Sequence, residues 1–394
     1  MRVIWVLLLL LSCSCAIGQR SITGTVIDAE KGLPLPGVSV FLSNTSVGTL
    51  TDDRGRFQLL LPNGKFELVA TSVGYATFQQ AVLGEGSDSL LIRMFTKTST
   101  LETVVVEAFE KDGWKKWGRW FLEQFIGMSA YAAECRLLNP EVLRFRLSEK
   151  GKLLTVIAKE PLVIENKALG YRIRYQMEEF WFAFDTQLLF YAGFPFFEPM
   201  KGAKNRQQKW VEKRKEVYTG SVLHFMRALH AGRFQEEGFE VRAMHKKTNL
   251  EKERVRQLYR TMFLESDMIN MAGDSSSYYS RVLKQPNLLS TIDKELLSGE
   301  QLGTMSDSSV YMLRFQDFLH VWFKPQGAPV EFLQSFPESG GRRISELQLV
   351  DAPAIEVWAN GYYADPANLI FNGFWGWWEK MATMLPLDYE WVNK

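Results

Sequence analysis

The sequence predicts a multidomain protein, with an N-terminal all-β seven-stranded sandwich followed by an α+β domain. Three observations support this prediction. Short runs of alternating apolar and polar residues, separated by turn residues, fill positions 21–95. From position 114 onward, helical and strand-like patterns are mixed. Hydrophobic residues make up 46% of the 394 residues and charged residues 23%, which is ordinary for globular domains.

The same patterns set the expected domain boundaries. We expect a signal peptide at 1–18, the sandwich at 19–95, a linker at 96–113 and an α+β domain of unknown function at 114–394. The net charge of +1 argues against a dedicated nucleic-acid or membrane-surface protein.

The first expected strand places Ile22, Gly24 and Val26 on one face, because side chains alternate along a strand. The other strands are expected at 38–42, 49–51, 57–61, 65–71, 76–83 and 89–94. Between them, 52–55 predicts a tight turn, since Asp bonds its own backbone and Gly accepts positive φ. Residues 62–64, Pro-Asn-Gly, are a hairpin signal. Such spacing of strands and turns is typical of a sandwich.

Four motifs occur in order along this stretch. They are Gly24-Thr-Val26, the Leu-Pro-Leu-Pro-Gly-Val run at 33–38, the Thr-Asp-x-x-Gly-x-Phe run at 51–57, and Gly74-Tyr75. Together they resemble the carboxypeptidase regulatory-like domain, a transthyretin-like β-sandwich, in which the third motif is a hairpin. The resemblance implies a non-catalytic module, common at the N-terminus of Bacteroidetes outer-membrane receptors and related envelope proteins.

Two further resemblances are more limited. Residues 101–107 resemble the linker that those receptors carry between the sandwich and their plug. Residues 139–225 resemble an uncharacterised region that accompanies the sandwich in similar envelope proteins. That second resemblance implies no activity and no site residues.

The N-terminus predicts export. Arg2 precedes an apolar run at 4–11, and the small residues at 16–18 form a cleavage site before Gln19. Cys13 offers a competing lipidation site. Both routes lead out of the cytoplasm, to the periplasm or to the outer membrane. After cleavage only Cys135 remains, which we interpret as a buried small hydrophobe rather than a nucleophile.

Residues 114–125 predict an amphipathic helix, because Trp114, Trp117, Phe121 and Phe125 fall on one face. Packing on the next domain is the preferred interpretation. A membrane-surface helix is the alternative, since Trp and Lys together also suit a lipid interface.

Beyond this helix, alternation predicts an antiparallel sheet with one solvated face over 140–199. Helices are expected at 205–217, 218–231 and 250–264, and strands at 238–244, 311–323, 330–336 and 344–350. The polar segment 272–301 is expected to be a long loop or a mobile segment.

Positions 201–260 are strongly basic, with sixteen Lys and Arg against seven Asp and Glu. One interpretation is an electrostatic patch for an anionic partner, such as lipid headgroups or acidic polysaccharide. The other, which we prefer, is a set of solvated helix faces. Near the C-terminus, Tyr362, Tyr363, Trp375, Trp377 and Trp378 are candidate ligand-binding residues that could stack on sugars, although terminal aromatics also pack into cores.

Catalytic motifs are missing from the sequence. None of the four histidines (His224, His230, His245 and His320) precedes a carboxylate by three positions, so the zinc motif of metallocarboxypeptidases is missing. A nucleophile elbow and a phosphate-binding loop are also missing. We therefore expect no catalytic residue, no metal and no cofactor.

The preferred functional hypothesis is a non-catalytic exported envelope protein that binds another envelope protein or a glycan. The alternatives are an accessory component of a TonB-dependent-type uptake system and an enzyme of unrecognised type. Nucleic acid is not expected as a partner. Membrane association through a lipidated Cys13 or through the helix at 114–125 remains open.

Overall fold

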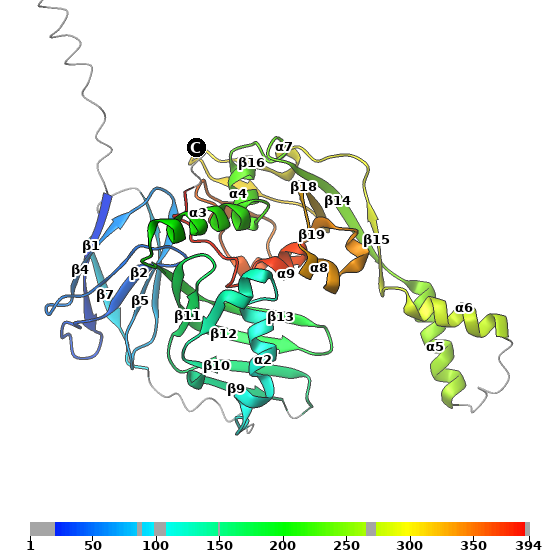
Figure 1. Cartoon of the computed structure of the whole chain (residues 1–394), viewed down its shortest axis with the longest axis horizontal. Coiled ribbons are helices and arrows are strands. Elements are labelled where there is room, and N and C mark those ends of the chain that lie inside the picture. Colours follow the sequence, from blue (N-terminus) through cyan, green and yellow to red (C-terminus); the bar gives the residue numbers. More distant parts are fainter. Residues whose placement is uncertain (1–19, 85–88, 98–107, 149, 265–272, 391–394) are drawn as a thin grey trace, which may run out of the picture. The chain divides into compact units, whose positions relative to one another are not determined.

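The computed structural model describes residues 20–84, 89–97, 108–148, 150–264 and 273–390 (Figure 1). The described chain forms two compact units. The first comprises positions up to 227 together with 358–362 and 379–394, and the second comprises 228–357 and 363–378. The sandwich and the sheet that follows it therefore share one unit.

The sandwich contains seven strands in two sheets, drawn in blue in Figure 1. One sheet has the order β4-β1-β7 and the other β3-β2-β5-β6. The strands are β1 Arg20–Asp28, β2 Ser39–Leu42, β3 Gly48–Leu50, β4 Arg56–Leu61, β5 Lys65–Thr71, β6 Phe78–Leu83 and β7 Ser89–Met94. All pairings are antiparallel except β1 with β7, which is parallel. The sequence prediction of seven strands at these positions is confirmed.

Alternation along the strands builds the core of the sandwich. In β4 every second side chain is buried, and Phe57, Leu59 and Leu61 all point into the core. They meet Val40 and Leu68 from the facing sheet. Each buried large apolar side chain contributes about 1.5–3 kcal/mol, so this alternating pattern favours packing of the two sheets against each other.

The tight turn predicted at 52–55 is confirmed, whereas the hairpin predicted at 62–64 is wrong. The 52–55 turn forms as expected, with Gly55 at φ 70° donating its N–H to the Asp52 carbonyl. However, neither this turn nor 62–64 closes a hairpin within one sheet. Strand β4 pairs with β1, whereas β3 and β5 both pair with β2. Both turns therefore carry the chain from one sheet of the sandwich to the other.

The rest of the first unit is built around a six-stranded antiparallel sheet, whose path runs β8-β11-β12-β10-β9, with β13 on the free edge of β12. The strands are β8 Cys135–Leu137, β9 Leu143–Leu147, β10 Leu153–Ala158, β11 Leu162–Asn166, β12 Tyr171–Ala183 and β13 Leu188–Pro199. Short 3-10 helices at Ala130–Glu134 and Pro140–Val142 precede β8 and β9. The expected antiparallel sheet over 140–199 is confirmed, although β12 is one long strand with a bulge near Met177.

Helix α2 (Gly113–Phe125) covers one face of this sheet (Figure 1). Phe121 and Phe125 are fully buried and contact Phe180 with ring centroids 5.0 and 6.4 Å apart. Because its apolar face lies against the protein's own sheet, the packing interpretation of this helix is the one that the structure supports. Membrane association through it remains a prediction.

Helices α3 (Lys204–Tyr218) and α4 (Val222–His230) follow β13. Both were expected from the sequence within a few residues. The C-terminal segment, residues 379–390, completes the unit by joining its parts. Ala382 donates its N–H to Ile126 O, Leu387 to Asn44 O, and the carboxylate of Asp388 accepts from the backbone N of Ser46 at 3.0 Å.

The second unit contains a five-stranded sheet in the order β15-β14-β18-β19-β21 and a three-stranded sheet β16-β17-β20. Its strands are β14 Phe239–Thr248, β15 Leu288–Ile292, β16 Gly303–Met305, β17 Tyr311–Leu313, β18 Phe318–Gly327, β19 Arg342–Leu349, β20 Ile355–Val357 and β21 Leu369–Gly373. Its helices are α5 Leu250–Leu264, α6 Gly273–Lys284, α7 Gly299–Leu302, α8 Val330–Ser335 and α9 Phe374–Trp378, with 3-10 turns at Pro337–Ser339 and Pro366–Asn368. The described chain is thus β-rich, with helices and strands mixed after the sandwich.

Two element predictions are wrong in this unit. The segment 272–301 is not a loop, because it contains α6, β15 and α7. Helix α6 packs on α5, with Tyr259 and Tyr279 rings 6.2 Å apart, so tertiary contact overrides its Ser-rich sequence. The expected strand at 330–336 is the helix α8, in which Phe332 is buried. A short apolar run cannot distinguish the two structures by periodicity alone.

Several predictions lie outside the described residues. They are the signal peptide at 1–18 with Cys13 and Gln19, and the receptor-like linker at 101–107. Among the described helices, none is both long enough and apolar enough to cross a membrane.

Candidate functional site

The described residues contain no cluster of three or more His, Cys, Asp or Glu side chains that would suit a metal ion. Three of the histidines, His224, His230 and His245, have other partners. His224 Nδ1 accepts from Gly220 N at 3.0 Å, and His245 Nδ1 lies 2.7 Å from an Asp317 carboxylate oxygen. That carboxylate raises the pKa of His245, whereas burial lowers the pKa of His320.

Cys135 is the free cysteine of the described chain. Its Sγ lies 3.4 Å from the Tyr131 carbonyl oxygen, and burial raises the pKa of its thiol to about 12. A thiol with this pKa is protonated near neutrality and is a poor nucleophile. The geometry therefore favours the structural interpretation of Cys135.

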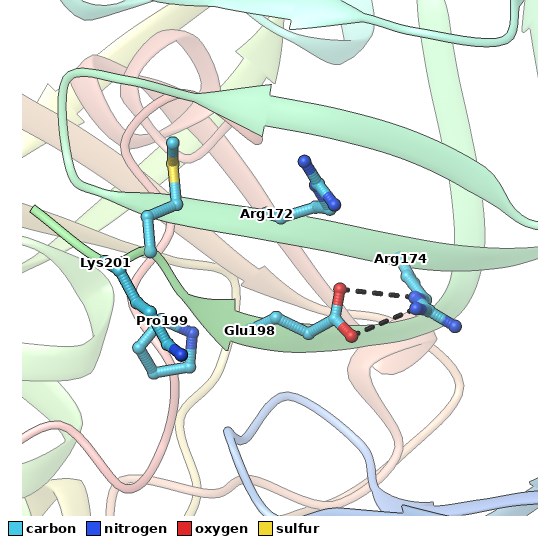
Figure 2. A pocket seen from close by; sticks show the side chains of 6 residues that line it. Arg172, Arg174, Glu198, Pro199 and Lys201 are labelled. Carbon is cyan, nitrogen blue, oxygen red and sulfur yellow. Dashed lines mark hydrogen bonds and ion pairs between the residues drawn. The ribbon is translucent and has the colours of Figure 1, made fainter.

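A hollow of about 310 Å³ lies on the solvent side of the β12–β13 hairpin (Figure 2). Three cations and one carboxylate line it: Arg172, Arg174, Lys201 and Glu198. Glu198 lies directly across from Arg172 in the strand register, yet its carboxylate binds Arg174, with N–O distances of 3.1 and 3.2 Å. Figure 2 shows Arg172 outside this pair.

A second hollow of about 460 Å³ is lined by Ala203, Asn205, Arg206 and Lys209, at the start of α3. The first turn of α3 contains no acidic residue, and its N-cap Ala203 has no side chain that could accept a hydrogen bond. Basic side chains here have the same sign as the positive end of the helix dipole, so the local positive potential is high.

Five exposed cations in and beside the two hollows make up what we call the cationic face: Arg172 and Lys201 line the first hollow, Arg206 and Lys209 line the second, and Lys204 lies beside the second on α3. Within the described part of the chain none of the five forms an ion pair. The nearby acids are otherwise engaged, because Glu198 binds Arg174, Glu212 accepts from Gln208 at 3.1 Å, and Glu216 accepts from Tyr131 at 2.6 Å. Among the described residues, no direct ion pair therefore neutralises these five side chains.

Helix α3 is fixed to the sheet by Trp210. The indole is buried and donates its N–H to the Lys167 carbonyl at 2.9 Å. Two glycines make room for it. A Cβ at Gly170, which has φ +71°, would lie 2.3 Å from the indole ring, and one at Gly202 would lie 2.9 Å from it. The cationic face is thus presented on a firmly packed helix.

Arg214 provides the second attachment of α3. Its Nε donates to Leu169 O at 2.7 Å and its Nη2 donates to Gly170 O at 3.2 Å. The guanidinium also lies 4.0 Å from the centre of the Tyr171 ring. Burial lowers the pKa of Arg214 and raises the pKa of Tyr171 to about 12. This arginine is a structural residue and not part of the exposed face.

The basic block at 201–260 is divided between the two units. Half of its sixteen cations precede position 228, where the second unit begins. Arg227 is structural, since it donates to the carbonyls of Asn360, Leu387 and Tyr389. The block therefore spans both units, and only its first part contributes to the cationic face.

The five aromatic candidates are placed differently from the expected platform. Tyr362 belongs to the first unit, where its hydroxyl donates to Glu67 at 2.9 Å. Tyr363, Trp375, Trp377 and Trp378 belong to the second unit. The three tryptophans are only 1%, 7% and 4% exposed, so their rings offer little open face to a sugar. Their role in ligand binding remains a prediction, and their burial supports core packing.

Sequence reasoning did not single out Arg172, Lys201 or Arg206. Two signals were present. Arg172 and Arg174 alternate with buried apolar residues and so had to lie on the solvated face of β12. Four cations in nine residues, 201–209, follow the end of the next strand. What sequence could not supply is the β12–β13 register that brings these groups together.

Comparisons with known proteins identify a domain in the first part of the chain. Residues 22–106 match the CarboxypepD_reg-like domain. This finding confirms the resemblance derived from the four motifs. The CarboxypepD_reg-like domain covers the sandwich, and it includes none of the residues of the cationic face.

Two receptors from Formosa agariphila are similar to part of this chain. TonB-dependent receptor P39 is 34% identical over 88 residues, which is 22% of this chain and 8% of the receptor. TonB-dependent receptor P3 is 27% identical over 104 residues, or 26% of this chain and 10% of the receptor. The chain thus spans a tenth or less of the length of these relatives. The likeness supports an envelope context and no specific function.

A solved protein of unknown function from Bacteroides fragilis aligns with 86% of this chain and 93% of its own length, at 10% identity. Its TM-score is 0.16, which is too low for the likeness to carry an argument.

Proposed function

We propose that this chain is a non-catalytic exported protein of the cell envelope, and that its first unit binds an anionic envelope component through the cationic face. The observation that carries the proposal is the set of five exposed cations without a described partner, next to two hollows. Uncompensated positive charge on a packed scaffold attracts anions and raises their local concentration.

The match to the CarboxypepD_reg-like domain supports the envelope part of the proposal. The sandwich supports the site physically as well. Thr45 forms an isolated bridge with Phe196 on β13, and Phe197 donates its N–H to the Thr45 carbonyl at 2.9 Å. The sandwich therefore braces the strand that carries Glu198.

Binding to envelope material tests the proposal. The full chain is mixed with envelope fractions of a Gram-negative bacterium and sedimented at increasing salt. A variant with all five cations of the face changed to Gln is compared with a matched control, in which five other exposed cations of the first unit are changed to Gln: Arg54, Arg93, Lys97, Lys150 and Lys159. Both variants lose the same charge.

We expect salt-sensitive binding of the wild-type chain and of the control, and loss of binding in the cationic-face variant. Equal loss in both variants would mean that only net charge matters, and would contradict a defined site. Retained binding in the face variant would contradict the proposal outright.

A second candidate function is that of an accessory component of a TonB-dependent-type uptake system, favoured by the similarity to two such receptors. Cell fractionation with intact-mass measurement addresses it. A lipid on Cys13 and recovery with the outer membrane would support an anchored accessory role. A soluble product that begins at Gln19 would instead support binding within the periplasm.

A further inference from the structure

The two hollows adjoin one another. Lys201 lines the first and Ala203 lines the second, so only Gly202 separates their linings along the chain. The cations follow this connection, from Arg172 on β12 through Lys201 to Arg206 and Lys209 on α3. We infer that one acidic polysaccharide chain binds across both hollows. This inference rests on the proposed function and names its ligand.

The dimensions favour an extended ligand over a single small anion. The two hollows measure about 310 and 460 Å³, each within the range of about 300–1,000 Å³ that small-molecule sites occupy. Along α3, the five steps from Lys204 to Lys209 advance the helix by about 7.5 Å. One phosphate or sulfate ion would reach one of these hollows and leave the cations of the other without a partner.

The hydrogen-bonding groups that lie beside the cations, an amide and a carboxylate, favour a sugar as the ligand. Asn205 lies between two cations and lines the second hollow, and an amide can both donate to and accept from a hydroxyl. Glu198 places a carboxylate beside the free guanidinium of Arg172. A carboxylate repels phosphate and uronate oxygens alike, but it accepts readily from the hydroxyls that a sugar carries and inorganic phosphate at neutral pH largely lacks. A ligand with alternating acid and hydroxyl groups satisfies both neighbours.

The acid group of the sugar would be recognised by Arg172. A guanidinium presents two parallel N–H donors that match a carboxylate, so a uronic acid suits this position. Arg174 does not compete for it, because both its Nε and its Nη2 are held by Glu198. The Glu198–Arg174 pair therefore forms part of the wall of the hollow, and Arg172 is the arginine that binds the ligand.

A lipid surface fits the same face less well. A membrane-surface helix combines basic residues with apolar residues that insert between lipids. The first six residues of α3, 204–209, are all exposed and all polar. Val211 is the one exposed large apolar residue of α3, at 53% exposure, because Trp210, Val217 and Tyr218 are buried. The face can attract anionic headgroups but lacks an anchor among them.

Oligogalacturonates of defined length provide the test. Affinities of the full chain for the mono-, tri- and hexasaccharide are measured by isothermal titration calorimetry, beside neutral galacto-oligosaccharide, inorganic phosphate and phosphatidylglycerol vesicles. We expect the hexasaccharide to bind at least about tenfold more tightly than the monosaccharide, because one chain then engages both hollows.

Single substitutions locate the bound chain. Arg172→Gln acts in the first hollow and Lys209→Gln in the second, and each is expected to weaken hexasaccharide binding several-fold. Lys159→Gln, an exposed lysine on another strand end, is the control and is expected to change nothing. If only one of the two substitutions acts on the hexasaccharide, the ligand does not span both hollows and the inference fails.

The remaining outcomes separate the inference from the proposed function. Tight binding to the vesicles without binding of oligogalacturonate would overturn the polysaccharide and keep an anionic partner. Phosphate that binds as tightly as the hexasaccharide would reduce the site to a single-anion site. If no anionic probe depends on the cationic face, then both the inference and the proposed function fail.

Discussion

The two ends of helix α3 carry the same kind of side chain in opposite circumstances. In the second half of the helix, Arg214 is inserted against Tyr171 and donates to two backbone carbonyls. At the start, Lys204, Arg206 and Lys209 are exposed and form no ion pair with other described residues. The same charge stabilises the fold at one end and remains available to a ligand at the other. Predictions that separate stability from binding test this comparison.

Trp210→Ala should have the largest effect on stability. The substitution removes a buried indole, its hydrogen bond to Lys167 O and the packing against Gly170 and Gly202. We expect a loss of about 3–5 kcal/mol in the free energy of unfolding. Urea unfolding followed by circular dichroism measures it. Val211→Ala, at the neighbouring exposed position, is the control and should cost less than about 0.5 kcal/mol.

Arg214→Met should destabilise the chain by about 1–3 kcal/mol, because the buried Leu169 carbonyl loses its donor while the apolar stem is kept. Binding of anionic ligands should not change once the protein is folded. The same unfolding assay and the sedimentation assay check the two halves of this prediction. A loss of binding in folded protein would show that Arg214 belongs to the ligand site.

Glu379 offers a related contrast, because it supplies a carboxylate to the start of α4. Its Oε1 accepts from Val222 N at 2.9 Å, and Ser221 Oγ accepts from His224 N at 3.1 Å. No such group serves the start of α3. Burial raises the pKa of Glu379 from 4.5 to about 7, and burial lowers the pKa of the adjacent Lys380 to about 8.

The pH dependence of stability follows from this shift. The folded state binds the Glu379 proton more tightly than the unfolded state does. The resulting stabilisation is complete below pH 4.5 and is lost as the pH rises through 7. Lys380 titrates above that window. Glu379→Gln should remove this decline in unfolding free energy, whereas Glu212→Gln on the exposed side of α3 should preserve it. An unchanged pH profile in Glu379→Gln would contradict the assignment.

Lys204→Gln should have the smallest effect on the fold, within about 0.5 kcal/mol, because its side chain is exposed and has no described partner. It should nevertheless weaken anion binding and lower its dependence on salt, since one fewer counterion is released. Binding measured at several salt concentrations gives the slope. A stability loss as large as that of Arg214→Met would remove the distinction between the two ends of the helix.

Much of the fold was predictable from local pattern. Strands β9, β10 and β11 begin at the residues where alternation places them, and α5 has the expected bounds. Helix α8 and the segment that contains α6 were not predictable. Each is short or weakly helical by composition, and each is held by contacts with distant residues, such as the hydrogen bond from Tyr278 to Glu251. Local propensity is too small to decide such elements.

The candidate site, the cationic face, also separates what the sequence predicts from what distant contacts decide. The sequence contained every cation of the face, but it did not distinguish Arg214, which is built into the fold, from Lys209, which is not. It also did not show that Arg172 and Lys201, 29 positions apart, share a hollow. The strand register decides the second point, and the hydrogen bonds that Arg214 donates to Leu169 O and Gly170 O decide the first.

The sequence by itself therefore determined the sandwich, its family and the amphipathic helix on the next sheet. These features depend on patterns within a few tens of residues, which alternation, turns and helical periodicity record directly. Only the tertiary structure decided which charges are compensated and how the C-terminal segment ties residues 44–46 and 126 into one unit. Compensation depends on distances between groups far apart in the chain, and a sequence does not contain those distances.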